Sequence, residues 1–100
     1  MAETVEDLTV SYTEDGIETS KELDKVILSK GSWTTIIFRY QDWDKAKDVY
    51  GPDKFTIRRY QKRAGEYRQQ SKFNISSRAQ AEGLIKALQG WLGEGAGDAD

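Results

Sequence analysis

Residues 54–75 read KFTIRRYQKRAGEYRQQSKFNI, and this stretch decides the fold. In its first half apolar residues alternate with polar or basic ones, which is the period of a strand with two different sides. Residues 64–66 are a short connection that contains Gly, as expected for a hairpin. The same period in the second half puts these residues on one side: Tyr67, Gln69, Ser71, Phe73 and Ile75. The stretch therefore predicts an antiparallel hairpin with strands at 54–63 and 67–75.

Two earlier runs complete the predicted sheet. Residues 26–29 are a short run of mainly apolar residues, and residues 33–43 alternate along their whole length. One side of the longer run is formed by Ile36, Phe38 and Tyr40, and the other by Trp33, Thr35, Ile37, Arg39 and Gln41. The polar residues 44–53 end in Gly-Pro-Asp, which indicates a turn before the hairpin.

A helix is predicted after the hairpin. Ser77 is a favourable N-cap, and Gln80 three residues later completes a capping box. An apolar stripe then recurs at helical spacing in Ala81, Leu84, Ile85, Leu88 and Leu92. The sequence thus predicts an α+β fold in residues 23–92, a curved four-stranded antiparallel sheet followed by one C-terminal helix (ββββα).

Both ends of the chain are acidic and poor in large apolar residues. Residues 1–22 are predicted to form an acidic, mostly disordered tail, although the alternation at residues 8–12 allows a short edge strand. Residues 93–100 are rich in Gly and Asp and predict a second disordered tail. About 70 residues then remain to form a core, and a dimer would add to the stability of so small a domain.

The charges are distributed very unevenly along the chain. Residues 1–20 contain six acidic residues and no Lys or Arg, whereas residues 21–90 contain all 15 basic residues and eight acidic ones. Within residues 54–72 seven basic residues accompany a single acidic one, Glu66. Such a basic domain between acidic ends indicates a polyanionic partner.

The composition argues against several kinds of chemistry. The chain has no Cys and no His, so it lacks thiolates, disulfides, and the most common general base and metal ligand. The Ser residues therefore have no His to activate them, and the Asp residues at 42–53 fit turn positions. We expect a protein that is not an enzyme, with no catalytic residue, no metal site and no cofactor. No apolar run is long enough to span a membrane, and no secretory signal is evident. The expected location is cytoplasmic, at the nucleoid if the cell is bacterial.

Basic, aromatic and amide side chains are concentrated in the hairpin and the strand before it. Guanidinium groups bind phosphates, and flat rings stack on unpaired bases for roughly 1–3 kcal/mol each. The predicted nucleic-acid-binding residues are Trp33, Arg39, Arg58, Tyr60, Lys62, Arg63, Tyr67, Arg68 and Lys72. The pattern predicts a basic ridge if the side of Arg58, Tyr60 and Lys62 coincides with that of Arg68, Gln70, Lys72 and Asn74. The alternative is a solvated face whose charges keep the protein soluble and protect its edges.

The Trp residues have more than one explanation. Trp33 and Trp43 either stack on bases or fill the core or a subunit interface, because a small domain depends on large side chains. Trp91 lies off the main helical stripe and is predicted to pack at a dimer contact.

Three short motifs carry a resemblance to a known family. They are Ile57-Arg58-Arg59-Tyr60, Gly65-Glu66 and Ser71-Lys72-Phe73-Asn74-Ile75-Ser76. With the predicted order of strands and helix, residues 24–92 resemble the transcriptional positive cofactor four family and its Whirly-like relatives. In that family a strand with an arginine and an aromatic residue precedes a Gly-containing turn. A basic residue shortly before an Ile-Ser pair then leads into the helix.

The resemblance implies a homodimer formed through the C-terminal helix and the sheet, whose ridges bind two antiparallel runs of single-stranded DNA. Members of the family act in transcription and in handling unwound DNA. The residues that match the ridge are Arg58, Tyr60 and Lys72, with Arg39 and Trp33 on the preceding strand. The chain departs from the family in the long acid-containing connection at residues 43–54, and in its acidic flank where eukaryotic members are rich in Ser and Lys.

The sequence thus predicts a dimeric, largely sequence-tolerant single-stranded DNA-binding protein with a role as a transcriptional cofactor or regulator. One alternative is a protein-protein interaction module in which the ridge docks an acidic partner and the Trp residues are anchors. Another is an RNA-binding protein, including one that reads the shape of double-stranded RNA. Because the acidic residues 1–20 face a basic domain in one chain, they are predicted to compete with nucleic acid for the ridge.

Overall fold

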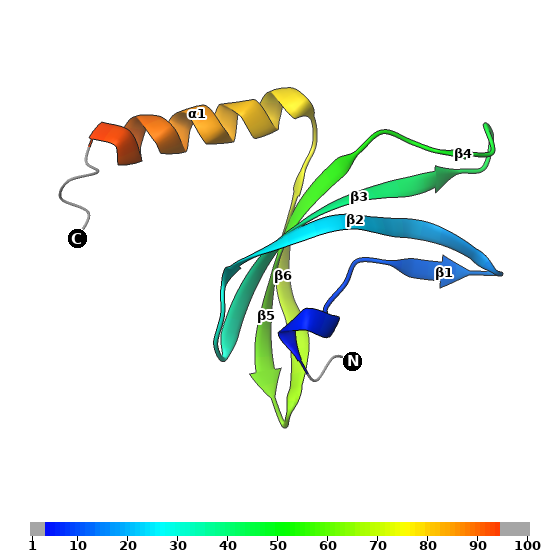
Figure 1. Ribbon diagram of the computed structural model, residues 1–100, viewed down its shortest axis with the longest axis horizontal. Coiled ribbons are helices and arrows are strands. Elements are labelled where there is room, and N and C mark those ends of the chain that lie inside the picture. Colours follow the sequence, from blue (N-terminus) through cyan, green and yellow to red (C-terminus); the bar gives the residue numbers. More distant parts are fainter. Residues whose placement is uncertain (1–3, 95–100) are drawn as a thin grey trace.

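The computed structural model of the protein describes residues 4–94. These residues form one curled antiparallel sheet and one long helix (Figure 1). The elements are the 3-10 helix η1 (Val5–Asp7), the strands β1 (Tyr12–Glu14), β2 (Ile17–Ser29), β3 (Trp33–Asp44), β4 (Val49–Tyr50), β5 (Lys54–Arg63) and β6 (Glu66–Ile75), and the helix α1 (Arg78–Glu94). The predicted α+β class, antiparallel sheet and C-terminal helix are confirmed, but the sheet has six strands rather than four.

The strands follow one another in the sheet almost as they do in the chain. The order is β1-β2-β3-β5-β6, every neighbouring pair is antiparallel, and the short β4 pairs with the end of β3. The β5–β6 hairpin turns at Ala64 and Gly65, whose φ angles are 52° and 80°. Positive φ at both central residues is the geometry of the tight turn that suits the twist of a hairpin. The hairpin predicted from residues 54–75 is therefore confirmed.

The prediction that residues 1–22 are mostly disordered is wrong for residues 4–22. Asp15 and Gly16 form a second tight turn with φ angles of 53° and 80°, which pairs β1 with the start of β2. The strand β2 continues from Ile17 far beyond the predicted run at residues 26–29, because it pairs with β3 along its length. An acidic composition did not prevent order, since each of these strands gains backbone hydrogen bonds from a neighbour.

The two sides of the sheet are unlike. We call one the covered face, which carries Thr34, Ile36 and Phe38 of β3 and Thr56, Arg58 and Tyr60 of β5. We call the other the open face, which carries Trp33, Ile37 and Arg39 of β3 and Phe55, Ile57 and Arg59 of β5. The core lies on the covered face, where Ile36 and Phe38 have no exposed surface. The predicted alternation of β3 and β5 is confirmed by this division.

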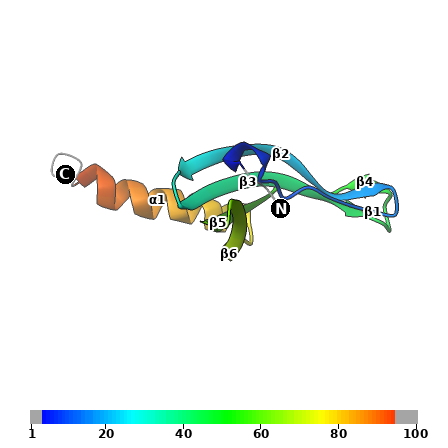
Figure 2. The same cartoon turned by 90° about the horizontal axis from the view of Figure 1, so that it is seen from below.

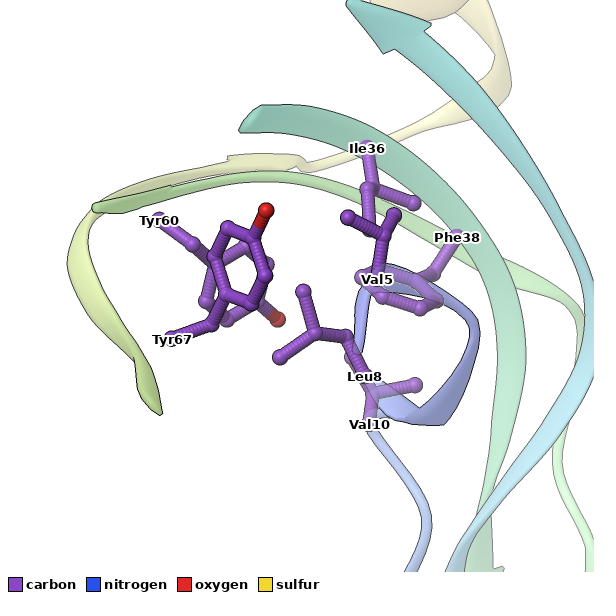
Figure 3. Close-up of a cluster of buried hydrophobic side chains, with 7 residues drawn as sticks. All are labelled: Val5, Leu8, Val10, Ile36, Phe38, Tyr60 and Tyr67. Carbon is purple, nitrogen blue, oxygen red and sulfur yellow. The ribbon is translucent and has the colours of Figure 1, made fainter. Parts of the chain in front are cut away.

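Residues 4–10 close the core, and we call them the cover segment. The apolar side chains of Val5, Leu8 and Val10 pack against the covered face and are almost fully buried (Figure 3). The cover segment has no strand of its own, and regular pairing with β2 begins only at Tyr12. The alternation noted at residues 8–12 thus reflects a packed, extended segment that leads into the edge strand.

A β-bulge in β6 changes which side chains share a side. Ser71 lies opposite Arg59 and Gln69 lies opposite Tyr60, so Gln70 is an extra residue on this strand. Side chains directly opposite each other share a face of the sheet. Tyr67 and Gln69 therefore lie on the covered face, but Ser71, Phe73 and Ile75 lie on the open face. The prediction that these five residues share one side is wrong because a bulge leaves no clear mark in the pattern.

The helix α1 begins where the sequence indicates. The Ser77 hydroxyl accepts a hydrogen bond from the Gln80 backbone amide at 3.1 Å, which confirms Ser77 as the N-cap. The Gln80 side chain reaches back to the amide of Ser76 at 2.6 Å, one residue earlier than in the standard box. The helix continues through Glu94, so residues 93–94 of the predicted second tail are helical. The rest of that tail, residues 95–100, lies outside the described residues, as do residues 1–3.

The helix extends away from the sheet instead of packing on it (Figure 1 and Figure 2). Of the strands, α1 packs chiefly beside β6, the strand that it follows. The radius of gyration is 16.0 Å, whereas a compact domain of this length has about 13 Å. The predicted apolar stripe is present, but Ile85, Leu88 and Leu92 are exposed. A single chain therefore leaves the apolar side of its helix uncovered.

Candidate nucleic-acid interface

The structure divides the predicted binding residues between the two faces. The side of the covered face carries Arg58, Tyr60, Lys62, Tyr67 and Lys72. The open face carries Trp33, Arg39, Arg63 and Arg68. Arg68 and Lys72 do not share a side because the bulge at Gln70 lies between them. The predicted ridge therefore contains Arg58, Lys62 and Lys72 but not Arg68.

Three cations that the β5–β6 hairpin places on the covered-face side lack an acidic partner. Arg58 and Lys72 lie directly opposite each other across β5 and β6, and Lys62 lies further along β5. Among the residues that the structure describes, none of the three forms a salt bridge. Like charges directly opposite each other in a sheet destabilise it. An arrangement that keeps such a pair without a carboxylate is suited to an external anion.

The Arg58 guanidinium is oriented by neutral groups of its own sheet. It donates to Gln69 Oε1 at 3.0 Å and to Thr56 Oγ1 at 3.4 Å. These bonds use a polar side chain from each of the two strands without neutralising the charge. Arg58 is thus held in place while its full charge remains available to a phosphate.

The basic residues of the open face are compensated only in part. Arg59 lies over the Trp33 ring and Arg63 donates to Gln61 Oε1, and among the described residues neither forms a salt bridge. Arg39 pairs with Asp53 at 3.4 Å, and Arg68 pairs with Glu66 at 3.6 Å. Exposed pairs of this kind add little stability, but they reduce the net charge of the surface. The side of Arg58, Lys62 and Lys72 is therefore the less compensated of the two sides of the β5–β6 hairpin.

Two tyrosine rings lie on the same face of the sheet as these three cations. Tyr60 and Tyr67 are only 5% and 8% exposed, and the cover segment packs against them (Figure 3). The Tyr67 hydroxyl donates to the Gly31 carbonyl at 3.1 Å, and Lys62 Nζ lies 5.5 Å from the centre of the Tyr67 ring. Burial raises the pKa of the Tyr60 hydroxyl, although the nearby Arg58 opposes this effect. Neither ring is open to a base in this structure, contrary to the exposed ridge that the sequence suggested.

The three Trp residues have different surroundings. Trp33 is 40% exposed, and the Arg59 guanidinium lies 4.2 Å from the centre of its ring. Trp43 packs edge-on against Tyr50 at 5.0 Å between ring centres, in the β3–β4 hairpin. Trp91 on α1 is 72% exposed. Trp33 and Trp91 therefore expose the most ring surface of the three, but Trp33 belongs to the open face and Trp91 to α1, so neither is on the side of Arg58, Lys62 and Lys72.

A further cation on the covered face was not predicted. Lys25 of β2 lies opposite Phe38, and its ammonium group donates to the Glu6 carbonyl at 2.7 Å and to the Leu8 carbonyl at 2.6 Å. A bulge in β2 between Glu22 and Asp24 determines on which side Lys25 lies. No simple alternation in the sequence could have placed this residue.

Lys54 and Asp42 form a separate pair at the end of β3. The Lys54 ammonium lies 2.8 Å from Asp42 Oδ2, and the Ser20 hydroxyl donates to Asp42 Oδ1 at 2.9 Å. Partial burial by itself would raise the pKa of Asp42, but these two hydrogen bonds outweigh it and lower the pKa. Lys54 is thereby engaged within the sheet and does not belong with the three unpaired cations.

The cover segment is held mainly by side chains, since Lys25 binds two of its carbonyls and Glu6 pairs with Lys30 at 3.2 Å. The Thr9 hydroxyl also donates to the Glu22 carboxylate. A segment without ladder hydrogen bonds to the sheet opens locally at a lower free energy than the strands that it covers.

Comparison of the chain with protein-family models, with curated proteins and with solved structures finds no match. The resemblance drawn from the short motifs therefore stays a prediction. Within residues 4–94, no helix is long and apolar enough to cross a membrane.

Proposed function

We propose that the protein binds single-stranded nucleic acid, in the first place DNA, with little dependence on base sequence. The observation that carries this proposal is the unpaired cationic set of Arg58, Lys62 and Lys72 on one side of the β5–β6 hairpin. The mutual repulsion of Arg58 and Lys72 is relieved when phosphates lie between or above them. The binding free energy then comes largely from neutralising the sugar-phosphate backbone.

Base stacking is the second contribution that we propose. Tyr60 and Tyr67 lie on the same face as the three cations, and Lys62 Nζ is 5.5 Å from the centre of the Tyr67 ring. Stacking a base on such a ring contributes roughly 1–3 kcal/mol without regard to base identity. It requires that the cover segment leave the rings, because both are buried in its presence.

We further propose that the binding unit is a homodimer. Large apolar side chains are exposed on the open face and on α1: Val26, Trp33, Phe73, Ile85, Leu88, Trp91 and Leu92. At roughly 100 Å² each, they present on the order of 700 Å² per chain, close to the area per partner of a stable interface. A second copy of the chain can cover both surfaces if its helix lies on the open face of the first.

The open face has a place for such a helix. A shallow hollow of about 170 Å³ is lined mostly by residues of this face, among them Val26, Ile37 and Phe55. The covered-face side, with its unpaired cations, would stay accessible on each chain of the pair. A dimer of this kind presents two basic surfaces, which suits two runs of single-stranded DNA and a role with unwound DNA in transcription.

One observation favours a second candidate function. The covered face already holds a peptide, the cover segment, which carries the acidic residues Glu6 and Asp7 beside buried apolar ones. The same face could therefore dock an acidic segment of another protein. A competition experiment between oligo-dT and an acidic peptide with the sequence of residues 4–14 separates the two functions.

The proposal is tested by titrating the protein into fluorescent oligo-dT at several salt concentrations. Three phosphate contacts on a single strand predict that log K falls with log salt with a slope of about −2 per chain. Absence of binding at low salt, or a slope near zero, would refute it. Competition with oligo-U and with duplexes then tells whether DNA, single-stranded RNA or double-stranded RNA is preferred.

A further inference from the structure

The cover segment occupies the surface that a base needs in order to stack. Val5, Leu8 and Val10 belong to the same buried cluster as Tyr60 and Tyr67 (Figure 3). Any base that stacks on these rings must take the place of apolar side chains of the cover segment. Segment and base are therefore mutually exclusive at this position.

The cover segment also engages a cation that a phosphate could use. Lys25 Nζ donates to two of its carbonyl oxygens, those of Glu6 and Leu8, and the Glu6 carboxylate pairs with Lys30. These carbonyl and carboxylate oxygens accept hydrogen bonds from the ammonium groups, as the phosphate oxygens of a nucleic-acid backbone would. The segment thus imitates both parts of a nucleotide chain, with apolar groups against the rings and oxygens against the ammonium groups.

Displacement of the cover segment by a nucleic-acid strand costs less free energy than opening of the segment in water. The cover segment has no backbone ladder to the sheet, since pairing with β2 begins at Tyr12. If it leaves, Ile36, Phe38 and the two tyrosine rings lose their cover, which is unfavourable in water. A stacked base restores apolar contact on that surface, so an incoming strand compensates for what the segment gives up.

We propose that residues 4–10 are an intramolecular competitor that nucleic acid displaces, and that Lys25 becomes a further phosphate-binding residue once they leave. This inference rests on the proposed function and adds its regulation. The apparent affinity is then reduced by the fraction of molecules whose cover segment is open. For an open fraction of about 10% or less, release of the segment tightens binding by about tenfold or more.

The test compares a weakened segment with a locked one. Leu8→Ser with Val10→Ser loosens the segment and is expected to tighten oligo-dT binding by about tenfold or more at low salt. The matched control is Tyr12→Ser with Ile17→Ser, which makes the same kind of change at exposed positions of the β1–β2 hairpin. This control is expected to bind like the wild type.

The locked form keeps the proposal testable if the loosened variant fails to fold. The chain has no Cys, so Glu6→Cys with Lys30→Cys introduces a unique pair of thiols, which a short bis-maleimide joins across the observed contact. The cross-linked protein is expected to bind oligo-dT about tenfold more weakly than the same variant with its thiols capped singly. Equal affinity of the linked and capped forms overturns the inference while leaving the proposed function intact. Absence of binding in every form, wild type included, overturns both.

Discussion

Replacing both members of the opposed pair, Arg58→Ala with Lys72→Ala, should separate binding from stability. The two residues face each other across β5 and β6 and have no carboxylate partner among residues 4–94. Each charge-assisted contact to a phosphate contributes at least about 1.5 kcal/mol, so losing two weakens oligo-dT binding by about a hundredfold at low salt. With Lys62 left as the one remaining member of the set of Arg58, Lys62 and Lys72, the slope of log K against log salt falls from about −2 to about −0.7 per chain.

The same substitution should change stability little. Relief of the repulsion between opposed like charges stabilises the sheet by roughly 0.2–1 kcal/mol. Loss of the Arg58 hydrogen bonds to Gln69 and Thr56 costs about 1 kcal/mol, so the two effects nearly cancel. Thermal unfolding followed by circular dichroism is expected to shift by only a few degrees, roughly 4–8 °C at most.

The control for this experiment is a double variant on the opposite face, Arg39→Ala with Arg68→Ala. It removes the same formal charge, but from residues that pair with Asp53 and Glu66. Oligo-dT affinity and salt slope are expected to stay close to those of the wild type. If this control weakens binding as much as Arg58→Ala with Lys72→Ala does, net charge rather than a defined surface determines the affinity, and the reasoning is refuted.

Further predictions concern the dimer and the titration of the sheet. Ile85→Glu with Leu88→Glu should convert the proposed dimer to a monomer in sedimentation velocity, whereas Lys86→Glu on the other side of the helix should not. A dimer in both variants would contradict the proposed interface. Burial raises the pKa of Tyr60, so the stabilising contribution of this residue is full below the unfolded pKa of about 10 and is lost as the pH rises through the folded pKa. In urea unfolding, Tyr60→Phe should therefore lose less stability above that pH than the wild type does. Parallel curves of stability against pH for the two proteins would refute this prediction. Hydrogen bonds lower the pKa of Asp42 despite its partial burial, so the stabilising contribution of this residue is present above the unfolded pKa of about 3.9 and is lost as the pH falls through the folded pKa. Asp42→Asn should therefore make the free energy of unfolding in urea depend less on pH in the acid range. An unchanged dependence would contradict the assignment.

Much of the fold could be predicted because its signals are local. The alternation in residues 33–43 and 54–63, the Ala-Gly turn and the Ser77 cap each depend on a few neighbouring residues, and all are present in the structure. The order of residues 4–22 could not be predicted in the same way. Their acidic composition favours disorder, and what orders them is pairing and packing with distant parts of the chain.

The candidate site was predicted less completely than the fold. The two-residue alternation along residues 54–63 correctly placed Arg58 and Lys62 on one face of the sheet, but the bulge at Gln70 puts Arg68 and Lys72 on opposite faces. A bulge shifts every later side chain to the other face without changing the composition of the strand. Burial of Tyr60 beneath the cover segment could not be predicted from local patterns either, because it depends on a contact between residues 4–10 and the distant strand β5.

The central claim is that unpaired cations on the covered-face side contact the nucleic acid. Lysine acetylation followed by mass spectrometry, with and without oligo-dT, tests it residue by residue. Lys62 and Lys72 are expected to be protected by the oligonucleotide, while Lys86 on α1 and Lys47 before β4 keep their reactivity. Protection of Lys86 or Lys47 with Lys62 and Lys72 still fully reactive would contradict the claim.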